Sequence, residues 1–310
     1  MQKIFSFVLI SVLIFTSCKK KGKLPPIDNQ KDLDGALIND SSLINPAGFL
    51  LSEAIPNPSA ADKQKNVVIA VHGFSASNFE WLEFHSWARS KTDVYVSRVL
   101  LGGHGRNYED FRKATWQNWQ EPIIDEYNRL RGMGYTKINF ITSSTGCPLV
   151  LDLVASKKID TDMLKHIYFI DPIIVPSNKL LPLIPVLGGI IINYSTTQLD
   201  EAENGYWYKY RPHQALNELD KITRTSRKKL QKGITLPSGV SLNVYKSEKD
   251  GSADPVSAVM IKKGIKGCNV NMVNSNLHVF TRLLGRSSYT NEDKALQLKT
   301  FEEIYSSLNN

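Results

Sequence analysis

The sequence predicts an α/β protein: a doubly wound, mostly parallel sheet with an inserted cap. Short, continuous apolar runs such as "NVVIAV" (Asn66–Val71) suit strands that are buried on both faces. These runs alternate with segments whose apolar residues recur at helical spacing, for example Trp116–Leu130. Because strands alternate with helices, we expect right-handed crossovers and helices on both faces of the sheet.

The expected elements follow one another in a regular order along the chain. Strands are expected at Asn66–Val71, Val94–Leu101, Lys137–Ile141, His166–Ile170, Ser241–Lys246 and Asn269–Val273. Helices are expected at Glu80–Ser90 and Trp116–Leu130, and from Pro148 to Ala155. The turns "HGF", "GGHG" and "TSSTG" follow the first three strands. A doubly wound sheet binds ligands at the carboxyl ends of its strands, so these turns predict a site at that edge.

The interval between the fourth and fifth strands, Pro172–Gly239, is too long for a simple crossover loop. It opens with the apolar segment "LLPLIPVLGGIIINY", continues with the aromatic "YWYKYRP", and ends in the amphipathic stretch His213–Leu230. We interpret about residues 172–239 as a cap over the carboxyl edge, in which Leu180–Ile192 would line an apolar pocket. The alternative is a pair of ordinary core helices joined by a long loop, and the placement of Pro and Gly favours the cap.

The first residues have the pattern of an export signal. A positively charged start, Met1–Lys3, precedes the apolar run Phe5–Phe15, which is too short to span a bilayer as a helix. Small residues then lead to Cys18. The segment resembles the lipobox of bacterial lipoproteins, although Phe15 stands where that pattern usually has a leucine. The resemblance implies removal of the signal peptide 1–17, attachment of lipid to Cys18, and an exported protein anchored to a bacterial cell membrane. An uncleaved anchor with an incidental cysteine is the alternative.

The rest of the composition indicates one large domain after a tether. Residues 18–35 are charged, contain proline and lack periodicity, whereas 36–310 are long enough for a single core. Two further cysteines, Cys147 and Cys268, do not make a disulfide framework, and Cys147 is expected in the core. The net charge of +8 comes partly from the lysines after Cys18, and no nucleic-acid motif accompanies it. The six histidines show no metal-binding spacing, so neither a metal nor a cofactor is predicted.

The stretch "TSSTG" (Thr142–Gly146) has the form of a strand-to-helix turn that projects a serine above the sheet edge. Ser144 is the candidate nucleophile, and Thr142 replaces the first glycine of the G-x-S-x-G pattern. The N–H of Thr145 would donate to a developing oxyanion at the N-terminus of the following helix. Taken alone, the pattern is weak, because Ser-Thr-Gly turns are common.

A serine nucleophile needs a base, and the base needs an orienting acid. His278 lies directly after the last expected strand and follows the candidate serine and acids in chain order. Three aspartates are candidates for the acid. Asp250 comes first after the fifth strand and is preferred, Asp254 precedes a proline as turn residues often do, and Asp171 follows the fourth strand.

The motifs "VHGF", "GGHG", "SSTG", "EKDGSADPVSA" and "LHVF" occur in the order found in α/β-hydrolases. Over about residues 66–285 the chain resembles that superfamily, and more narrowly bacterial carboxylesterases and monoacylglycerol-lipase-like enzymes with a cap. The resemblance implies that Phe74, after "HG", donates the second oxyanion N–H. It also implies that His104 has an architectural role.

These residues together predict a serine carboxylesterase that works through an acyl-enzyme. Ser144 would attack the ester, His278 would act as base and Asp250 would orient it. The expected substrate is a short- or medium-chain ester or a monoacylglycerol. Two alternatives remain open. The same triad could serve a thioesterase, amidase or acyltransferase, and the fold could belong to a lipoprotein that binds a lipid or a partner without catalysis.

Overall fold

The computed structural model describes residues 24–28, 31–33, 57–178 and 193–309. The expected signal peptide, the lipidation site Cys18 and the apolar cap segment Leu180–Ile192 lie outside the described residues. Within the described part of the chain, no helix has the length and apolar character needed to cross a membrane.

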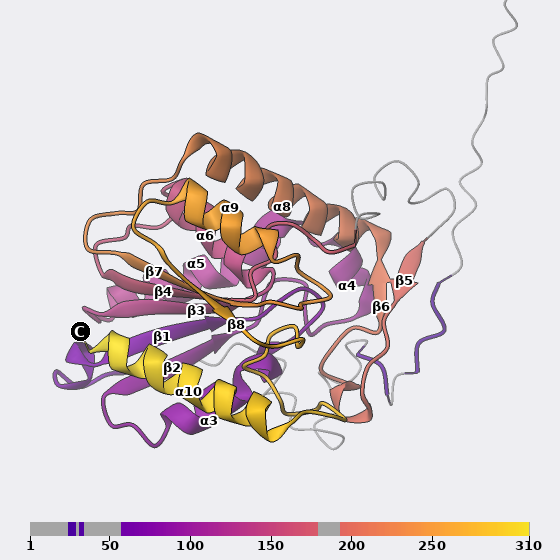
Figure 1. The fold of residues 1–310 in the computed structure, drawn as a ribbon, viewed down its shortest axis with the longest axis horizontal. Coiled ribbons are helices and arrows are strands. Elements are labelled where there is room, and N and C mark those ends of the chain that lie inside the picture. Colours follow the sequence, from indigo (N-terminus) through magenta and orange to yellow (C-terminus); the bar gives the residue numbers. More distant parts are fainter. Residues whose placement is uncertain (1–23, 29–30, 34–56, 179–192, 310) are drawn as a thin grey trace, which may run out of the picture.

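Six parallel strands form one sheet in the order β2-β1-β3-β4-β7-β8 (Figure 1). The strands are β1 (Asn66–Val71), β2 (Val94–Val99), β3 (Ile138–Ser143), β4 (Leu164–Ile170), β7 (Ser241–Ser247) and β8 (Asn269–Val273). Each end lies within two residues of the expected position. The predicted α/β class, with a doubly wound and mostly parallel sheet, is therefore confirmed.

Helices cover both faces of the sheet (Figure 1). One layer contains α5 (Trp116–Gly132), α6 (Gly146–Ala155), α8 (His213–Lys232) and α9 (Val256–Gly264). The other layer contains α3 (Leu82–Ala88) and α10 (Asn291–Leu308). The other helical segments among the described residues are the 3₁₀ turns η1 (Asp62–Gln64), η2 (Asn78–Trp81) and η4 (Glu201–Glu203), and the short helix α4 (Tyr108–Lys113).

The local sequence explains why the central elements form. All six residues of β1 are buried, as expected for a strand with helices on both sides. Helix α5 begins with a capping box in which Thr115 and Asn118 satisfy each other's backbone N–H groups. Its apolar side chains at helical spacing are fully buried against the sheet, and they are Trp119, Ile123, Tyr127 and Leu130.

One expected helix is divided in the structure. The helix expected at Glu80–Ser90 is divided into η2 and the shorter α3, because the backbone of Trp81 (φ −107°, ψ 12°) leaves the α-helical region between them. The end of the predicted cap, His213–Leu230, forms α8, which packs on α6 and α9. This helix therefore belongs to the layer that covers the sheet, and its buried face includes Leu219, Ile222 and Leu230.

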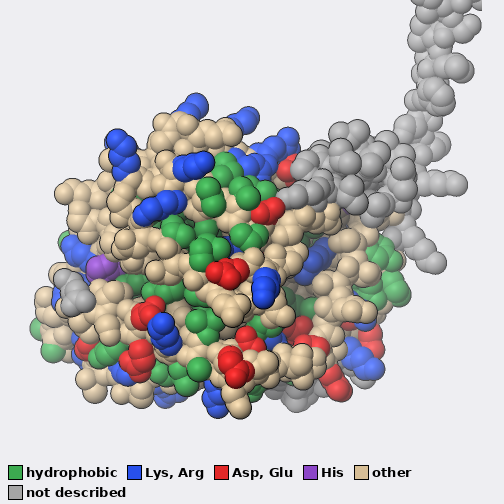
Figure 2. All heavy atoms as spheres, viewed as in Figure 1, with side chains coloured by type: hydrophobic (Ala, Val, Ile, Leu, Met, Phe, Trp, Pro, Cys, Tyr) green, Lys and Arg blue, Asp and Glu red, His purple; other side chains and the backbone are tan. Residues whose placement is uncertain are grey.

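The middle of the predicted cap lies near the carboxyl edge of the sheet. There β5 (Tyr194–Thr196) and β6 (Tyr210–Pro212) form a small antiparallel pair beside α4 (Figure 1). On the face shown in Figure 2, Lys and Arg side chains gather over α8 and α9. Part of the chain's positive charge is thus solvated on these two helices, as exposed charged faces usually are.

Candidate active site

Ser144 occupies a strained turn between β3 and α6. Its φ is +48°, which is unusual for a residue with a side chain. The strand ends at Ser143 and the helix begins at Gly146, so Ser144 stands at the apex. A Cβ on Gly146 would lie 2.7 Å from the carbonyl oxygen of Val71. Only glycine allows α6 to approach β1 this closely, and the approach sets the sharp turn.

Thr142 takes the place of the first glycine without preventing the turn. It is fully buried at the end of β3, and its hydroxyl donates to the sulfur of Cys147 (3.2 Å) and to the carbonyl of Tyr168 (3.4 Å). Cys147 is a free, buried thiol, in agreement with its predicted place in the core. Burial raises the pKa of this thiol far above its usual value, so it remains protonated.

Three predicted side chains meet above the sheet edge. The Nε2 atom of His278 lies 2.9 Å from the Oγ of Ser144, and its Nδ1 atom lies 2.8 Å from Oδ2 of Asp250. The three residues come from the loops after β3, β7 and β8. Ser144 and Asp250 are buried, whereas a quarter of the His278 side chain is exposed. In this arrangement the imidazole can take a proton from the serine hydroxyl, and the carboxylate can orient the imidazole.

Of the three candidate acids, it is Asp250 that hydrogen-bonds to the His278 ring. Its second oxygen, Oδ1, accepts from the backbone N–H groups of Ser252 (2.7 Å) and Ala253 (3.1 Å). Asp254 instead accepts from the N–H of Val256 (3.0 Å), as expected for a turn residue. Burial alone would raise the pKa of Asp250. The hydrogen bond and charge of His278, together with the charge of Lys246, outweigh burial and hold that pKa well below its usual range.

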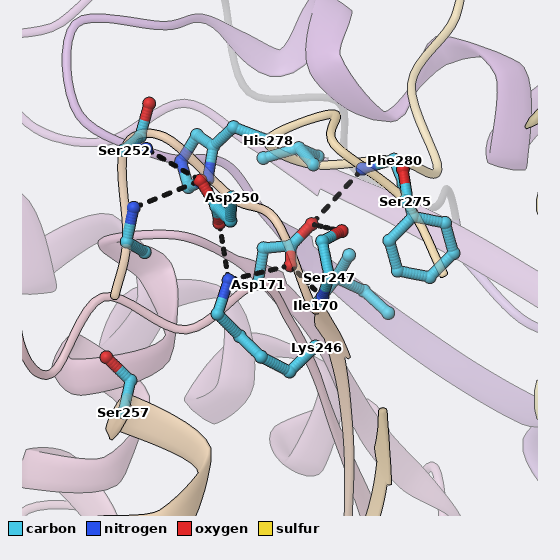
Figure 3. Close-up of polar contacts among 12 residues, drawn as sticks. Ile170, Asp171, Lys246, Ser247, Asp250, Ser252, Ser257, Ser275, His278 and Phe280 are labelled. Carbon is cyan, nitrogen blue, oxygen red and sulfur yellow. Dashed lines mark hydrogen bonds and ion pairs between the residues drawn. The ribbon is translucent and has the colours of Figure 1, made fainter. Parts of the chain in front are cut away.

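Asp171 accepts hydrogen bonds from the backbone beside Asp250 and His278. Its carboxylate accepts from the N–H of Ser247 (2.7 Å) and from the N–H of Phe280 (3.2 Å), two residues after His278 (Figure 3). Asp171 itself has a φ of +46° at the end of β4. It therefore ties the ends of β4 and β7 to the loop that carries His278.

Lys246 lies between the two aspartates (Figure 3). Its Nζ lies 3.1 Å from Oδ1 of Asp171 and 2.5 Å from Oδ2 of Asp250, so it forms an ion pair with each carboxylate. All three side chains are fully buried. Asp171, Asp250 and His278 are close enough to ligate a common metal ion, but the ammonium already binds both carboxylates. A cation at this place would have to displace Lys246, so the cluster does not fit a metal site.

The loop after β1 passes directly beside Ser144. A Cβ on Gly73 would lie 2.9 Å from the Cβ of Ser144. Glu80 holds this loop against the turn, because its Oε1 accepts from the N–H of Gly73 (2.8 Å) and also from the hydroxyl of Ser143. The two predicted oxyanion residues, Phe74 and Thr145, line the same cavity as Ser144.

The two histidines of the "HG" and "GGHG" turns are neutral and structural. The Nε2 of His72 accepts from the N–H of Leu101 (3.0 Å), which joins the loops after β1 and β2. His104 is fully buried, with its ring against those of Phe111 and Trp119. Burial lowers the pKa of His72 to about 4 and that of His104 well below its usual value. Neither ring is part of the Ser144–His278–Asp250 arrangement.

A cavity of about 540 Å³ opens above Ser144 and His278. Its apolar wall includes Phe74, Ile173, Leu199, Trp207, Leu216 and Leu219. Five charged side chains of the described residues also line the cavity. They are Glu80 from η2, Glu203 from η4, Arg211 from β6, and Arg282 and Arg286 from the loop after β8.

Sequence reasoning did not find several of the residues that shape the site. Lys246 offered a signal, because a lysine at the end of a buried strand needs a partner. Glu80 and Arg211 offered none, since Ser143 lies 63 residues from Glu80 and Ser75 lies 136 residues from Arg211.

Solved structures of similar fold include several lipolytic enzymes. A chain from the structures of LipS and LipT, two metagenome-derived lipolytic enzymes, is 16% identical, with a TM-score of 0.64 over 83% of this chain and 96% of that one. The monoacylglycerol lipase of Paleococcus ferrophilus is 12% identical, with a TM-score of 0.59 over 82% and 97% of the two chains. A soluble variant of the monoglyceride lipase of Saccharomyces cerevisiae is 11% identical, with a TM-score of 0.64 over 84% and 90%.

These likenesses show that the chain has the α/β-hydrolase fold. At 11–16% identity they establish the fold alone. No protein-family model matches the sequence, and no curated protein matches it.

The Lys246→Met substitution tests the buried charge cluster. It leaves two carboxylates facing each other without a cation, so we expect a loss of about 3–5 kcal/mol in unfolding free energy at pH 8. One carboxylate should then take up a proton, with a folded-state pKa above the unfolded value of about 3.9, so the loss should be smaller at pH 5. Urea denaturation of the wild type and the variant at both pH values measures the loss in unfolding free energy.

The matched control is Lys249→Met, three residues away and exposed. It should change the unfolding free energy by no more than about 0.5 kcal/mol. A loss for Lys246→Met that is equally small, or that does not depend on pH, would contradict this account of the cluster.

Proposed function

We propose that the protein is a serine hydrolase that cleaves carboxylic esters through a covalent acyl-enzyme. The observation that carries the proposal is the continuous contact from Ser144 through His278 to Asp250, at 2.9 and 2.8 Å, at the floor of a cavity. The fold agrees with it, since α/β-hydrolases present a serine at this turn.

The proposed first half-reaction forms the acyl-enzyme. The Oγ of Ser144 attacks the ester carbonyl carbon while Nε2 of His278 takes the hydroxyl proton. Asp250 accepts from Nδ1–H, which selects the tautomer with a free Nε2 and stabilises the imidazolium. The carbonyl oxygen becomes an oxyanion, to which the N–H groups of Phe74 and Thr145 donate, each worth about 3 kcal/mol by analogy with other oxyanion holes. The intermediate then expels the alcohol, which receives the proton from His278.

The second half-reaction releases the acid. His278 removes a proton from water as the water oxygen attacks the acyl carbon, and the oxyanion forms again in the same place. Its collapse breaks the bond to Ser144, whose Oγ recovers the proton from the imidazolium. The products are the carboxylic acid and the free serine.

The apolar wall of the cavity supports a substrate with a hydrocarbon part. The compared structures include enzymes named as lipolytic enzymes and monoacylglycerol lipases. We therefore propose a short- or medium-chain ester or a monoacylglycerol as the substrate class, with no nucleic acid as a partner.

The N-terminal sequence supports a location at a membrane surface. We propose that the chain is exported, cleaved before Cys18 and lipidated there, which anchors it to a bacterial cell membrane. Mass spectrometry of protein from membranes of a bacterial host should find a mature chain that begins with a lipid-modified Cys18. An intact Met1 on the membrane-bound protein would reject this route.

A fluorophosphonate probe and a 4-nitrophenyl ester test the nucleophile together. We expect the wild type to hydrolyse 4-nitrophenyl butyrate and to be labelled at Ser144, because only a serine activated by a base reacts with the probe. Ser144→Ala should abolish labelling and reduce kcat/KM by about 10³-fold or more. Ser238→Ala, at an exposed loop residue, is the control and should retain both. A folded wild type that neither hydrolyses the ester nor reacts with the probe would support a binding protein instead.

The identity of the acid is tested by comparing two neighbouring aspartates. Asp250→Asn should reduce kcat by about 10⁴-fold, because an amide favours the wrong imidazole tautomer. Asp254→Asn should have little effect, since the His278 ring bonds to Asp250, whereas Asp254 accepts from the local backbone N–H of Val256 (3.0 Å). Circular dichroism checks that both variants are folded. Equal, mild losses in the two variants would show that Asp250 is not the acid.

A further inference from the structure

The cavity above Ser144 contains more positive than negative side chains. Arg211, Arg282 and Arg286 line it together with Glu80 and Glu203. Both carboxylates are already engaged. Glu203 pairs with Nη1 of Arg282 (2.5 Å), and Glu80 accepts from the loop after β1 and from Ser143. In the described part of the chain, no ion pair joins Arg211 or Arg286 to a carboxylate.

Arg211 is held beside the proposed oxyanion loop. Its Nε donates to the hydroxyl of Ser75 (3.1 Å), and its guanidinium carbon lies 5.9 Å from the centre of the Phe74 ring. Among the described residues, none accepts a hydrogen bond from its two terminal nitrogens. A planar guanidinium with both terminal nitrogens free is suited to bidentate binding of a carboxylate or phosphate.

Arg286 brings a second positive charge to the cavity from the loop that carries His278. Its Nε donates to the carbonyl of Arg282 (2.7 Å), and its Nη2 donates to the carbonyl of His278. These bonds fix the loop, and the guanidinium also lines the cavity. We therefore assign Arg286 a positioning role and a long-range attraction for anions.

Arg211 and Arg286 are half-buried, and this partial loss of water makes their charges costly without an anion. Desolvation lowers the pKa of Arg211 and that of Arg286, each to about 10. A desolvated cation with no carboxylate partner gains more from an anionic ligand than an exposed one does, because water competes less for it. Glu203 attracts Arg211 only at a distance, while its contact is with Arg282.

We propose that the substrate is an ester that also bears an anionic oxygen group, a carboxylate or a phosphate, which Arg211 binds while Ser144 attacks the ester carbonyl. The apolar wall residues Ile173, Leu216 and Leu219 would contact the hydrocarbon between the two groups. This inference rests on the proposed function, because it assigns the substrate of the same site. It distinguishes such a substrate from a neutral ester such as a monoacylglycerol.

The test compares esters that differ only in charge. Monoethyl esters of dicarboxylic acids, from glutarate to suberate, are matched with counterparts in which a primary amide replaces the carboxylate. For at least one chain length, the wild type should have a kcat/KM about tenfold or more higher for the anionic ester, the equivalent of one charge-assisted hydrogen bond. Added salt should reduce this ratio. A parallel pair, ethyl 6-phosphonooxyhexanoate and ethyl 6-hydroxyhexanoate, shows whether phosphate is preferred to carboxylate.

Variants connect the preference to Arg211. In Arg211→Gln the ratio should fall toward one, and in Arg211→Lys it should be intermediate, because the charge remains without the bidentate geometry. Arg89→Gln, an exposed arginine at the end of α3, should leave the ratio unchanged. Thermal unfolding of each variant checks the fold, and the wild-type ratio and its salt dependence decide the question even if an Arg211 variant does not fold.

The outcomes separate this inference from the proposed function. If 4-nitrophenyl butyrate is hydrolysed but no anionic ester is preferred at any chain length, the anionic substrate is overturned and the ester hydrolase stands. A preference that persists in Arg211→Gln would also overturn the assignment to Arg211. If no ester is cleaved and the fluorophosphonate does not label Ser144, the proposed function fails and this inference fails with it.

Discussion

The geometry of the candidate site depends on the close approach of α6 to the end of β1. Gly146 lies so near the carbonyl oxygens of Val71 and His72 that a Cβ would come within 2.7 and 3.0 Å of them. This close contact requires a sharp turn, in which Ser144 adopts a left-handed backbone conformation. That conformation costs about 1–3 kcal/mol for a residue with a side chain. The neighbouring strand offsets that cost, since the N–H of Ser144 donates to the carbonyl of Ile170 (3.0 Å) and its carbonyl accepts from Ile173 (3.2 Å). The proposed nucleophile is thus held by main-chain bonds to the end of β4 and to the residues that follow it.

Elements of the fold could be predicted from the sequence where local pattern decides structure. The fully buried strand β1 has a continuous apolar sequence, which predicts a strand covered on both faces. The sharp turn requires a small residue at Gly146, which the sequence also shows. The role of α8 could not be predicted in this way, because an amphipathic helix has the same pattern whether it covers a sheet or forms a cap. Its packing on α6 depends on residues distant in sequence.

The residues of the site divide in the same way, into those that a local pattern predicts and those that depend on contacts between distant parts of the chain. Ser144, Asp250 and His278 were found because each follows a strand, and parallel strands bring their carboxyl ends to one edge. Choosing Asp250 over Asp171 from sequence relied on its position alone, whereas the structure separates them by which atoms each carboxylate accepts from. Long-range contacts such as that between Arg211 and Ser75 join segments 136 residues apart, and no local pattern encodes them.

The charge of the buried cluster explains how Lys246 can contact Asp250, the acid in the proposed mechanism. A cation bound to Asp250 alone would cancel the negative charge that stabilises a protonated His278. Here Lys246 binds Asp171 as well, so one ammonium and two carboxylates leave a net charge of −1. That is the charge a lone aspartate would supply to the imidazolium. Lys246 can therefore hold Asp250 and the His278 loop in place without removing the electrostatic support that His278 would require as the proposed base.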